Sequence, residues 1–316
     1  MIERRGLLRF AVLSVLAAIA TIGLKTAAYV ITGSIGLLSD ALESLANLVA
    51  ALVALYALWV AARPADEEHA YGHTKAEYFS SGFEGLLIVV AAVGFVIAAV
   101  RRFIEAQPIQ EPALGLVVTG LASAVNLGVA RVLRRVGKRH ESITLEADAQ
   151  HLMADVWTSI GVIVGVGAAA ATGWYRLDPI VAMAVALNVL RSGVRLLGRS
   201  MHGLLDTSLP EETLSEIKAI LDAHSGEGVR YHALRSRQAG ARRFISFHIL
   251  VPGSWTVQRG HDLLERIEER IREAVPNSVV DTHLEPIEDP VSWEDTRLER
   301  PAGETAGPAP RPDAAG

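Results

Sequence analysis

Six long apolar stretches constrain this chain of 316 residues more than any other feature. The hydrocarbon core of a bilayer is about 30 Å thick, and an α-helix crosses it with roughly 20 apolar residues. Six such runs leave no polar faces for water, which excludes a soluble helical protein. The first run is too long for a signal peptide and lacks a small-residue cleavage site. The expected spans are 7–31, 35–62, 79–100, 113–133, 143–172 and 178–197, within a transmembrane domain of residues 1–206.

The amino-acid composition excludes several further classes of protein. Hydrophobic residues make up 50% of the chain and charged residues 21%, which excludes a disordered chain, a collagen-like fibre and a disulfide scaffold. The chain has no cysteine, so disulfides, thiolate catalysis and cysteine metal sites are excluded. The net charge of −5 gives no reason to expect a nucleic-acid partner.

The distribution of Lys and Arg predicts the orientation, because cytoplasmic loops carry the excess of these residues. Basic residues precede span 1, follow span 6, and lie between spans 2 and 3 and between spans 4 and 5. Arg101 and Arg102 break this pattern but are outnumbered. We therefore expect both termini in the cytoplasm. The default location is a plasma membrane, since no organellar signal is visible.

The remaining residues predict a second domain and a tail. Residues 207–290 show a helical period after Pro210, an alternating pattern around a Gln238-Ala239-Gly240 turn, then a helix and a last strand. The expected order is αββαβ, a small α+β domain in the cytoplasm. Residues 291–316 are rich in Pro, Gly, Ala and charge, so this segment is expected to be disordered.

Polar residues inside two spans predict a cation site. Span 2 contains Asp40, Glu43 and Asn47, and span 5 contains Asp148, His151 and Asp155. Both sets follow the spacing i, i+3, i+7, which places each set on one helical face. A charge within a bilayer costs at least about 2.5–3.5 kcal/mol, so both faces should point into the protein.

No Lys or Arg lies mid-span in a suitable place to neutralise these carboxylates. An i, i+4 pair from each helix can close a tetrahedral site for a divalent cation. Those pairs are Glu43 with Asn47 and His151 with Asp155, supported by the acids Asp40 and Asp148. Two alternatives remain open: helices joined by hydrogen bonds and protonated carboxylates, and a proton relay without metal.

The segments from Ser34 to Asn47 and from Ala147 to Asp155 resemble the second and fifth spans of the cation diffusion facilitators. The resemblance extends over about residues 8–290. It implies a transport site built from spans 2 and 5, a homodimer and a tail domain that resembles a metallochaperone. The family commonly has Asp or His at the position of Glu43 and Asp at that of Asn47. The amide of Asn47 removes one negative charge, which bears on the choice of metal.

The loop after span 2 offers a second group of ligands. Asp66, His69 and His73 are spaced by three and four residues, which allows a divalent ion to bind at the membrane surface. The alternative is a solvated acidic loop. A similar segment occurs in the family, and some members bind a second metal there. The resemblance also suggests an ion pair of Lys75 with Asp206 near the dimer axis. Glu84, in span 3, is expected to reach water at the cytoplasmic end.

The tail domain holds half of the ten histidines. The resemblance places four of them and one acid where some family members bind cytoplasmic metal: His232, His248, His261, His283 and Glu285. Metal bound there would bridge two protomers and bias the conformation of the transporter. The alternative is that these are ordinary surface histidines.

The sequence thus favours a secondary transporter that exports divalent transition metals, Zn²⁺ or Fe²⁺ first, with Mn²⁺, Co²⁺ and Cd²⁺ as further candidates. No phosphate loop with Lys and Ser/Thr is present, so a proton gradient is the expected energy source and no organic cofactor is needed. The alternative is a membrane-embedded metal sensor whose tail binds metal without transport. An intramembrane metalloenzyme is disfavoured, because no His-Glu-x-x-His motif occurs.

Overall fold

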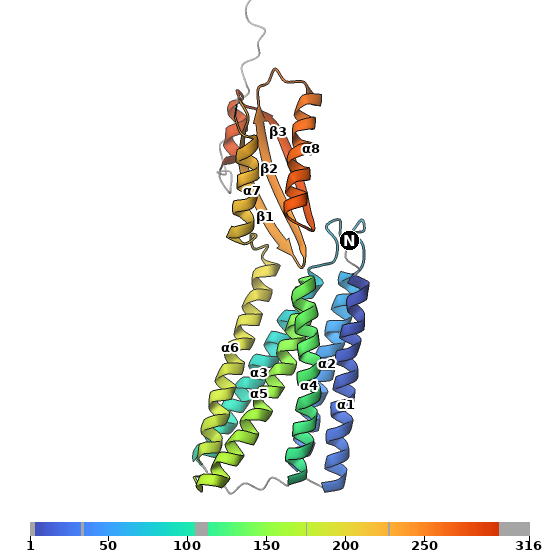
Figure 1. Ribbon diagram of the computed structural model, residues 1–316, viewed down its shortest axis with the longest axis vertical. Helices are drawn as coiled ribbons and strands as arrows, with labels where there is room; N and C mark the ends of the chain where they lie inside the picture. Colours follow the sequence, from blue (N-terminus) through green and yellow to red (C-terminus); the bar gives the residue numbers. More distant parts are fainter. Residues whose placement is uncertain (1–3, 33–34, 105–112, 175, 227, 297–316) are drawn as a thin grey trace, which may run out of the picture. The chain divides into compact units, whose positions relative to one another are not determined.

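The computed structural model describes residues 4–32, 35–104, 113–174, 176–226 and 228–296. The chain forms two compact units, Met1–Leu205 and Asp206–Gly316. The described part of the first unit contains a short 3-10 helix, Arg4–Leu7, and six long helices. These are α1 (Leu8–Thr32), α2 (Ile35–Ala61), α3 (Ala76–Ile104), α4 (Ala113–His140), α5 (Ile143–Thr172) and α6 (Leu177–Leu204) (Figure 1).

Within the described ranges, six helices are long and apolar enough to cross a membrane. Large apolar side chains such as Leu16, Val30 and Val90 are more than half exposed on these helices, as expected for surfaces that face lipid. The unit that follows has an αββαβ order with a three-stranded sheet. The predicted fold class is therefore confirmed.

Helix α5 lies at the centre of the first unit. It packs against α4, α6, α3 and α2, and it contributes to two separate apolar clusters. One cluster joins Leu145, Ala149 and Leu152 to residues of α1, α2 and α4. The other joins Ala147 to residues of α3 and α6. Polar side chains on α5 are consequently surrounded by protein rather than lipid.

Helices α3 and α6 approach each other closely because glycine lies at their contacts. A Cβ added at Gly193 would lie 2.8 Å from Cγ2 of Ile88, and one added at Gly85 would lie 3.0 Å from the backbone nitrogen of Leu197. A Cβ at Gly203 would overlap the buried ring of Tyr78. Small residues at helix contacts allow this backbone approach in membrane proteins.

An ion pair accounts for one of the two arginines that break the pattern of basic residues. Nη1 of Arg102, on α3, lies 3.2 Å from Oδ2 of Asp178, on α6. Asp178 is buried, with 5% of its surface exposed. The carboxylate compensates the charge of Arg102 at this end of the bundle.

The second unit contains α7 (Glu211–His224), β1 (Arg230–Ala239), β2 (Arg242–Val251), α8 (Val257–Ala274) and β3 (Ser278–Pro286). The sheet order is β1-β2-β3, with β1 antiparallel and β3 parallel to β2. Alternate residues of β2 from Ile245 to Val251 form a core with apolar residues of α7 and α8, so both helices cover the same face of the sheet.

The segment after the sheet differs from the expected disorder. Residues Pro290–Thr296 form a 3-10 helix, η2. The hydroxyl of Ser292 donates a hydrogen bond of 2.9 Å to the carbonyl of Pro286, and Ser292 is buried. These local contacts order a segment whose composition resembles that of a disordered tail. Residues 297–316 lie outside the described part.

We predict that Gly203→Ala lowers the thermal stability of the purified protein, because the new methyl group must displace the buried Tyr78 ring. Overpacking typically costs about 1–3 kcal/mol. The matched control is Gly198→Ala on the same helix, where an added Cβ meets nothing within 4 Å. A melting temperature that is equally unchanged in both variants would contradict the close packing of α3 and α6.

Candidate functional site

The polar faces of α2 and α5 meet inside the first unit. Nε2 of His151 lies 2.8 Å from Oδ1 of Asn47. The amide nitrogen of Asn47 donates a hydrogen bond of 2.5 Å to Oδ2 of Asp155. Asn47 and His151 are buried, with 8% and 6% of their surfaces exposed. Three of the four predicted ligands therefore form one continuous network between two helices.

The direction of these hydrogen bonds fixes the role of each atom. Because the amide nitrogen of Asn47 faces Asp155, its oxygen is the acceptor, and Nε2 of His151 carries the proton. Nδ1 of His151 is buried without a hydrogen-bond partner in the described part of the chain. A cation would replace these hydrogen bonds with bonds to the carboxylate, imidazole and amide oxygen.

The remaining predicted residues of the two stripes have different environments. Glu43 is half-buried one turn before Asn47 on α2, so it lies on the same side of that helix. The side chain of Asp40 lies outside the described residues. Asp148 is buried on α5, and its Oδ1 accepts a hydrogen bond of 2.9 Å from Ser14 of α1.

Two polar residues near the site come from helices that the sequence analysis did not connect with it. Asn126 on α4 is buried, and its amide nitrogen lies 3.4 Å from Oδ2 of Asp155. Ser14 on α1 holds Asp148. Neither helix contains a carboxylate, so neither carries the acidic stripe that marked α2 and α5. The available signal was the rule that polar groups in a membrane span normally face other helices, which applies to both residues.

The environment of Glu84 differs from the expectation that its side chain reaches water. Its side chain is fully buried on α3, with 0% of its surface exposed. The reason is that α3 packs against both α5 and α6 at this level.

The loop between α2 and α3 brings its three predicted ligands together. Oδ1 of Asp66 lies 3.2 Å from Nδ1 of His69, and Oδ2 of Asp66 lies 3.3 Å from Nε2 of His73. The three ligand atoms lie within 4.8 Å of one another. Gly72 adopts a positive φ of 83° between the two histidines, a conformation that glycine permits at no steric cost.

Hydrogen bonds and nearby charges favour the ionised form of the Asp66 carboxyl. Desolvation raises the pKa of its carboxyl, but hydrogen bonds from the backbone N–H and the ring of His69 and the charges of His73 and His69 outweigh this effect, so the pKa is lowered. The carboxylate therefore remains ionised in mildly acidic solution.

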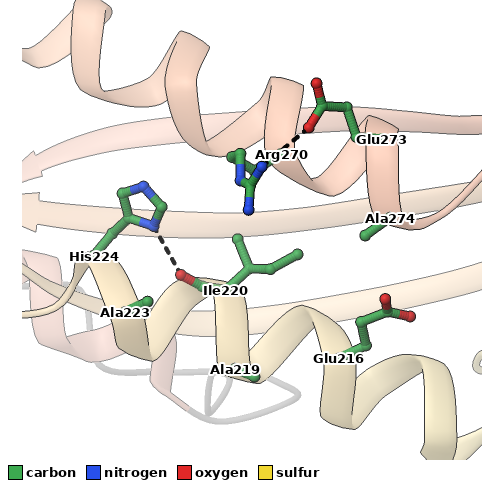
Figure 2. A pocket seen from close by; sticks show the side chains of 8 residues that line it. All are labelled: Glu216, Ala219, Ile220, Ala223, His224, Arg270, Glu273 and Ala274. Carbon is green, nitrogen blue, oxygen red and sulfur yellow. Dashed lines mark hydrogen bonds and ion pairs between the residues drawn. The ribbon is translucent and has the colours of Figure 1, made fainter.

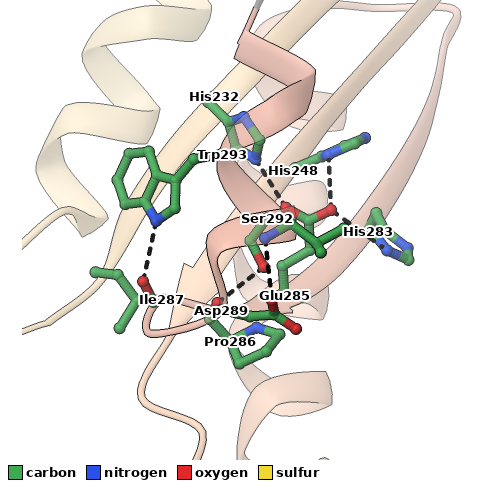
Figure 3. A network of polar contacts seen from close by, with 10 residues as sticks. His232, His248, His283, Glu285, Pro286, Ile287, Asp289, Ser292 and Trp293 are labelled. Atoms are coloured by element: carbon green, nitrogen blue, oxygen red, sulfur yellow. Dashed lines mark hydrogen bonds and ion pairs between the residues drawn. The ribbon is translucent and has the colours of Figure 1, made fainter. Parts of the chain in front are cut away.

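In the second unit, strand register gathers a further cluster. His232 pairs with His248 across β1 and β2, and His248 pairs with His283 across β2 and β3. The three imidazoles thus form one row across the sheet, on the face opposite α7 and α8. Glu285, two residues after His283, lies on the same face and contacts all three rings (Figure 3).

The three histidines of this cluster differ in their distance from the Glu285 carboxylate. Glu285 lies 2.8 Å from Nε2 of His232 and 3.2 Å from Nδ1 of His248. The distance from Glu285 to Nε2 of His283 is 3.6 Å, and the His283 side chain is 65% exposed. The candidate ligand atoms of His232, His248 and Glu285 lie within 4.8 Å of one another, close enough to hold one metal ion. His261 is exposed on α8, which covers the other face of the sheet, so it does not join this cluster within the chain.

Helix η2 covers one end of the histidine row. The Trp293 ring centroid lies 6.2 Å from that of His232, and its indole nitrogen donates a hydrogen bond of 3.0 Å to the carbonyl of Ile287. Figure 3 shows Trp293 and Ser292 beside the cluster. The segment limits access of water to His232, whose side chain is only 8% exposed.

The second unit also has a groove of about 490 Å³ between α7 and α8 (Figure 2). Ala219, Ile220, Ala223 and Ala274 give it an apolar lining, and Glu216, His224, Arg270 and Glu273 give it a charged one. Nδ1 of His224 bonds to the Ile220 carbonyl at 2.8 Å. Among the described residues, the polar side chains that line this groove do not form a group of three candidate metal ligands like that in the histidine row.

The two residues of the suggested dimer contact belong to different units. Asp206 forms an ion pair of 3.3 Å with Arg237 of its own unit. Lys75 lies at the start of α3, where its carbonyl accepts a hydrogen bond from the backbone N–H of Tyr78. Their mutual contact stays a prediction.

Comparison with known proteins supplies the identity. Residues 11–205 match the family described as the cation efflux transmembrane domain, and residues 209–287 match the cytoplasmic domain of cation efflux proteins, named ZT_dimer. The chain belongs to the cation efflux family. It is therefore a multi-pass membrane transporter and not an enzyme, and the resemblance to the cation diffusion facilitators is confirmed. The name of the cytoplasmic domain implies dimerisation.

Relatives in the cation efflux family span most of the chain. An uncharacterized transporter of Synechocystis sp., sll1263, is 55% identical over 90% of this chain and 92% of its own length. The cation-efflux pump FieF of Klebsiella pneumoniae is 30% identical over 88% of this chain and 92% of its own length. A solved structure named for the zinc transporter CzrB is 34% identical, covers 25% of this chain and 96% of its own, and has a TM-score of 0.24.

We predict that Co²⁺ bound at the histidine row quenches the fluorescence of Trp293, because the indole lies beside His232. All variants carry Asp155→Ala, so that Co²⁺ bound beside the tryptophan of α5 does not contribute to the signal. In this background, quenching should be lost in Trp293→Phe and retained in the control Trp255→Phe, whose ring packs against the core on the other face of the sheet. Glu285→Gln should shift quenching to higher Co²⁺ concentrations. Equal quenching with and without Trp293→Phe would contradict this geometry.

Proposed function

We propose that this cation efflux protein exports divalent transition-metal ions from the cytoplasm in exchange for protons. The buried network of Asn47, His151 and Asp155 carries this proposal. It supplies an imidazole, a carboxylate and an amide oxygen between two membrane helices, and Glu43 adds a second carboxylate on the same side of α2. This mixture of nitrogen and oxygen donors suits first-row divalent metals.

The donor set also bears on the choice of metal. An imidazole favours Zn²⁺ and Fe²⁺ over Mg²⁺ or Ca²⁺, which prefer oxygen ligands. With Asn47 in place of an acid, the four side chains carry two negative charges, which match the charge of one divalent ion. We rank Zn²⁺ and Fe²⁺ first, followed by Mn²⁺, Co²⁺ and Cd²⁺.

Proton exchange follows from the chemistry of the ligands. Metal binding requires a neutral imidazole with a free nitrogen and ionised carboxylates, so protons are released when metal binds. Protons arriving from the opposite side compete for the same groups and expel the metal. His151 and Asp155 also return to their hydrogen bonds with Asn47, which compensates the loss of the metal.

The two peripheral clusters fit supporting roles in a homodimer. The loop trio of Asp66, His69 and His73 can collect cations at the membrane surface, since two of its members are exposed. The cluster of His232, His248 and Glu285 can bind a regulatory metal ion in the cytoplasm. The exposed His261 and His283 then remain available for a second protomer.

We expect metal flux in proteoliposomes to depend on a pH gradient and to fall more than about 100-fold in Asp155→Ala, because loss of a ligand exceeds the 10–100-fold effect typical of supporting residues. Flux is measured for Zn²⁺, Fe²⁺, Mn²⁺, Co²⁺ and Cd²⁺. Asn47→Asp should change the order of the metals, since it adds a charge to the site.

The matched control is Gln150→Ala, which removes a polar side chain adjacent to His151 on α5 and should transport normally. Absence of flux with every metal, together with retained metal binding at the histidine row, would refute transport and favour the membrane-embedded sensor. Flux that ignores the pH gradient would refute proton exchange alone.

The orientation is testable because the chain has no cysteine. A membrane-impermeant maleimide should label Thr172→Cys, at the end of α5, in intact cells. It should label Glu269→Cys, exposed on α8, only after lysis. The reverse pattern would place the second unit outside the cytoplasm and invert the direction of transport.

A further inference from the structure

A second pair of carboxyl groups is buried between α3 and α5. Glu84 has 0% and Asp148 2% of its surface exposed. Their helices, α3 and α5, pack against each other. Ile88, one turn beyond Glu84, shares an apolar cluster with Ala147, the neighbour of Asp148. The pair is therefore enclosed where these two helices touch.

Three of the four carboxyl oxygens of this pair lack hydrogen-bond partners in the described part of the chain. Both carboxyl oxygens of Glu84, Oδ2 of Asp148 and the hydroxyl of Ser80 are buried without a hydrogen-bond partner in the described residues. Ser80 approaches the Glu84 carboxyl from one turn earlier on α3 but does not reach hydrogen-bonding geometry. Four unpartnered buried oxygens on neighbouring turns of α3 and α5 form an electronegative cluster that a positively charged ligand would stabilise.

The protein itself does not supply that charge. Within the described helices, no Lys or Arg bonds to Glu84 or to Oδ2 of Asp148. The other oxygen of Asp148 is occupied by the neutral hydroxyl of Ser14, at 2.9 Å. Two ionised carboxylates would leave a charge of −2, which one divalent cation neutralises.

We propose that Glu84, Asp148 and Ser80 form a second divalent-cation site in the membrane domain, adjacent to the transport site and distinct from it. Glu84 provides two oxygens, and Asp148 and Ser80 provide one each. An oxygen-only donor set favours hard cations such as Mn²⁺ over those that seek nitrogen or sulfur. The proposal rests on the proposed function for the identity of the ion.

The position of Glu84 and Asp148 along their helices places the second site on the path of an ion toward the transport site. Asp148 lies one turn before His151 on the same face of α5, and nearer than Asp155 to the end where α5 begins. Glu84 likewise lies in the first third of α3. An ion that arrives from the end that holds the loop trio meets this pair before it reaches Asp155.

The test counts Mn²⁺ ions bound to the full-length protein in lipid nanodiscs, by electron paramagnetic resonance of the free ion after equilibration. Glu84→Gln keeps the shape of the side chain and removes its charge, and we expect the loss of one bound ion per chain. Glu84→Asp should recover that ion with weaker affinity. Glu146→Gln, at a half-buried carboxylate of α5 that pairs with Arg199, is the matched control and should retain every ion.

The outcomes separate this proposal from the proposed function. Asp155→Ala should lose a different ion, and the double variant Glu84→Gln with Asp155→Ala should lose both. An unchanged count in Glu84→Gln would overturn the second site and show that protons neutralise the pair, whatever the result for Asp155→Ala. A count reduced in Glu84→Gln but not in Asp155→Ala would instead refute the transport site and leave the second site standing.

Discussion

The need to satisfy every polar group buried in a membrane governs this structure, because no water is available there to replace a missing partner. Helix α5 shows how this need is met. Its residues Asp148, His151 and Asp155 contact polar residues of α1, α2 and α4. These are Ser14, Asn47 and Asn126. The apolar clusters on either side keep lipid away from them. The need to bury these polar groups therefore explains both the central position of α5 in the bundle and the contacts that its polar residues make.

The same constraint bears on the proposed transport site, which must release a cation as well as bind it. Asn47 donates to Asp155 and accepts from His151, so the ligands have partners even without a cation. A cation bound at the proposed site would compete with these hydrogen bonds, which would keep its binding reversible. In the Glu84–Asp148 pair, three of the four carboxyl oxygens have no such partner among the described residues. The two sites thus differ in how strongly they depend on a bound positive charge.

The second unit gathers its candidate ligands by a different geometry. In a sheet, residues that pair across strands lie side by side, and alternate residues share a face. Register brings His232, His248 and His283 into one row although they are distant in sequence. Helix η2 then adds Trp293 to the edge of that row. A small fold whose core lies on the other face can thereby carry a row of candidate metal ligands without losing apolar packing.

The sequence determined the six helices and both polar stripes, because bilayer thickness fixes the length of a span and the helical period fixes which residues share a face. The local spacing of Asp66, His69 and His73 likewise sufficed to predict their proximity. Tertiary structure alone decided that Ser14 and Asn126 join α5, that Glu84 is buried, that His261 lies on the other face from the histidine row, and that residues 290–296 are ordered. These contacts depend on which helices touch and on strand register, and neither is encoded in the spacing of residues along a single element.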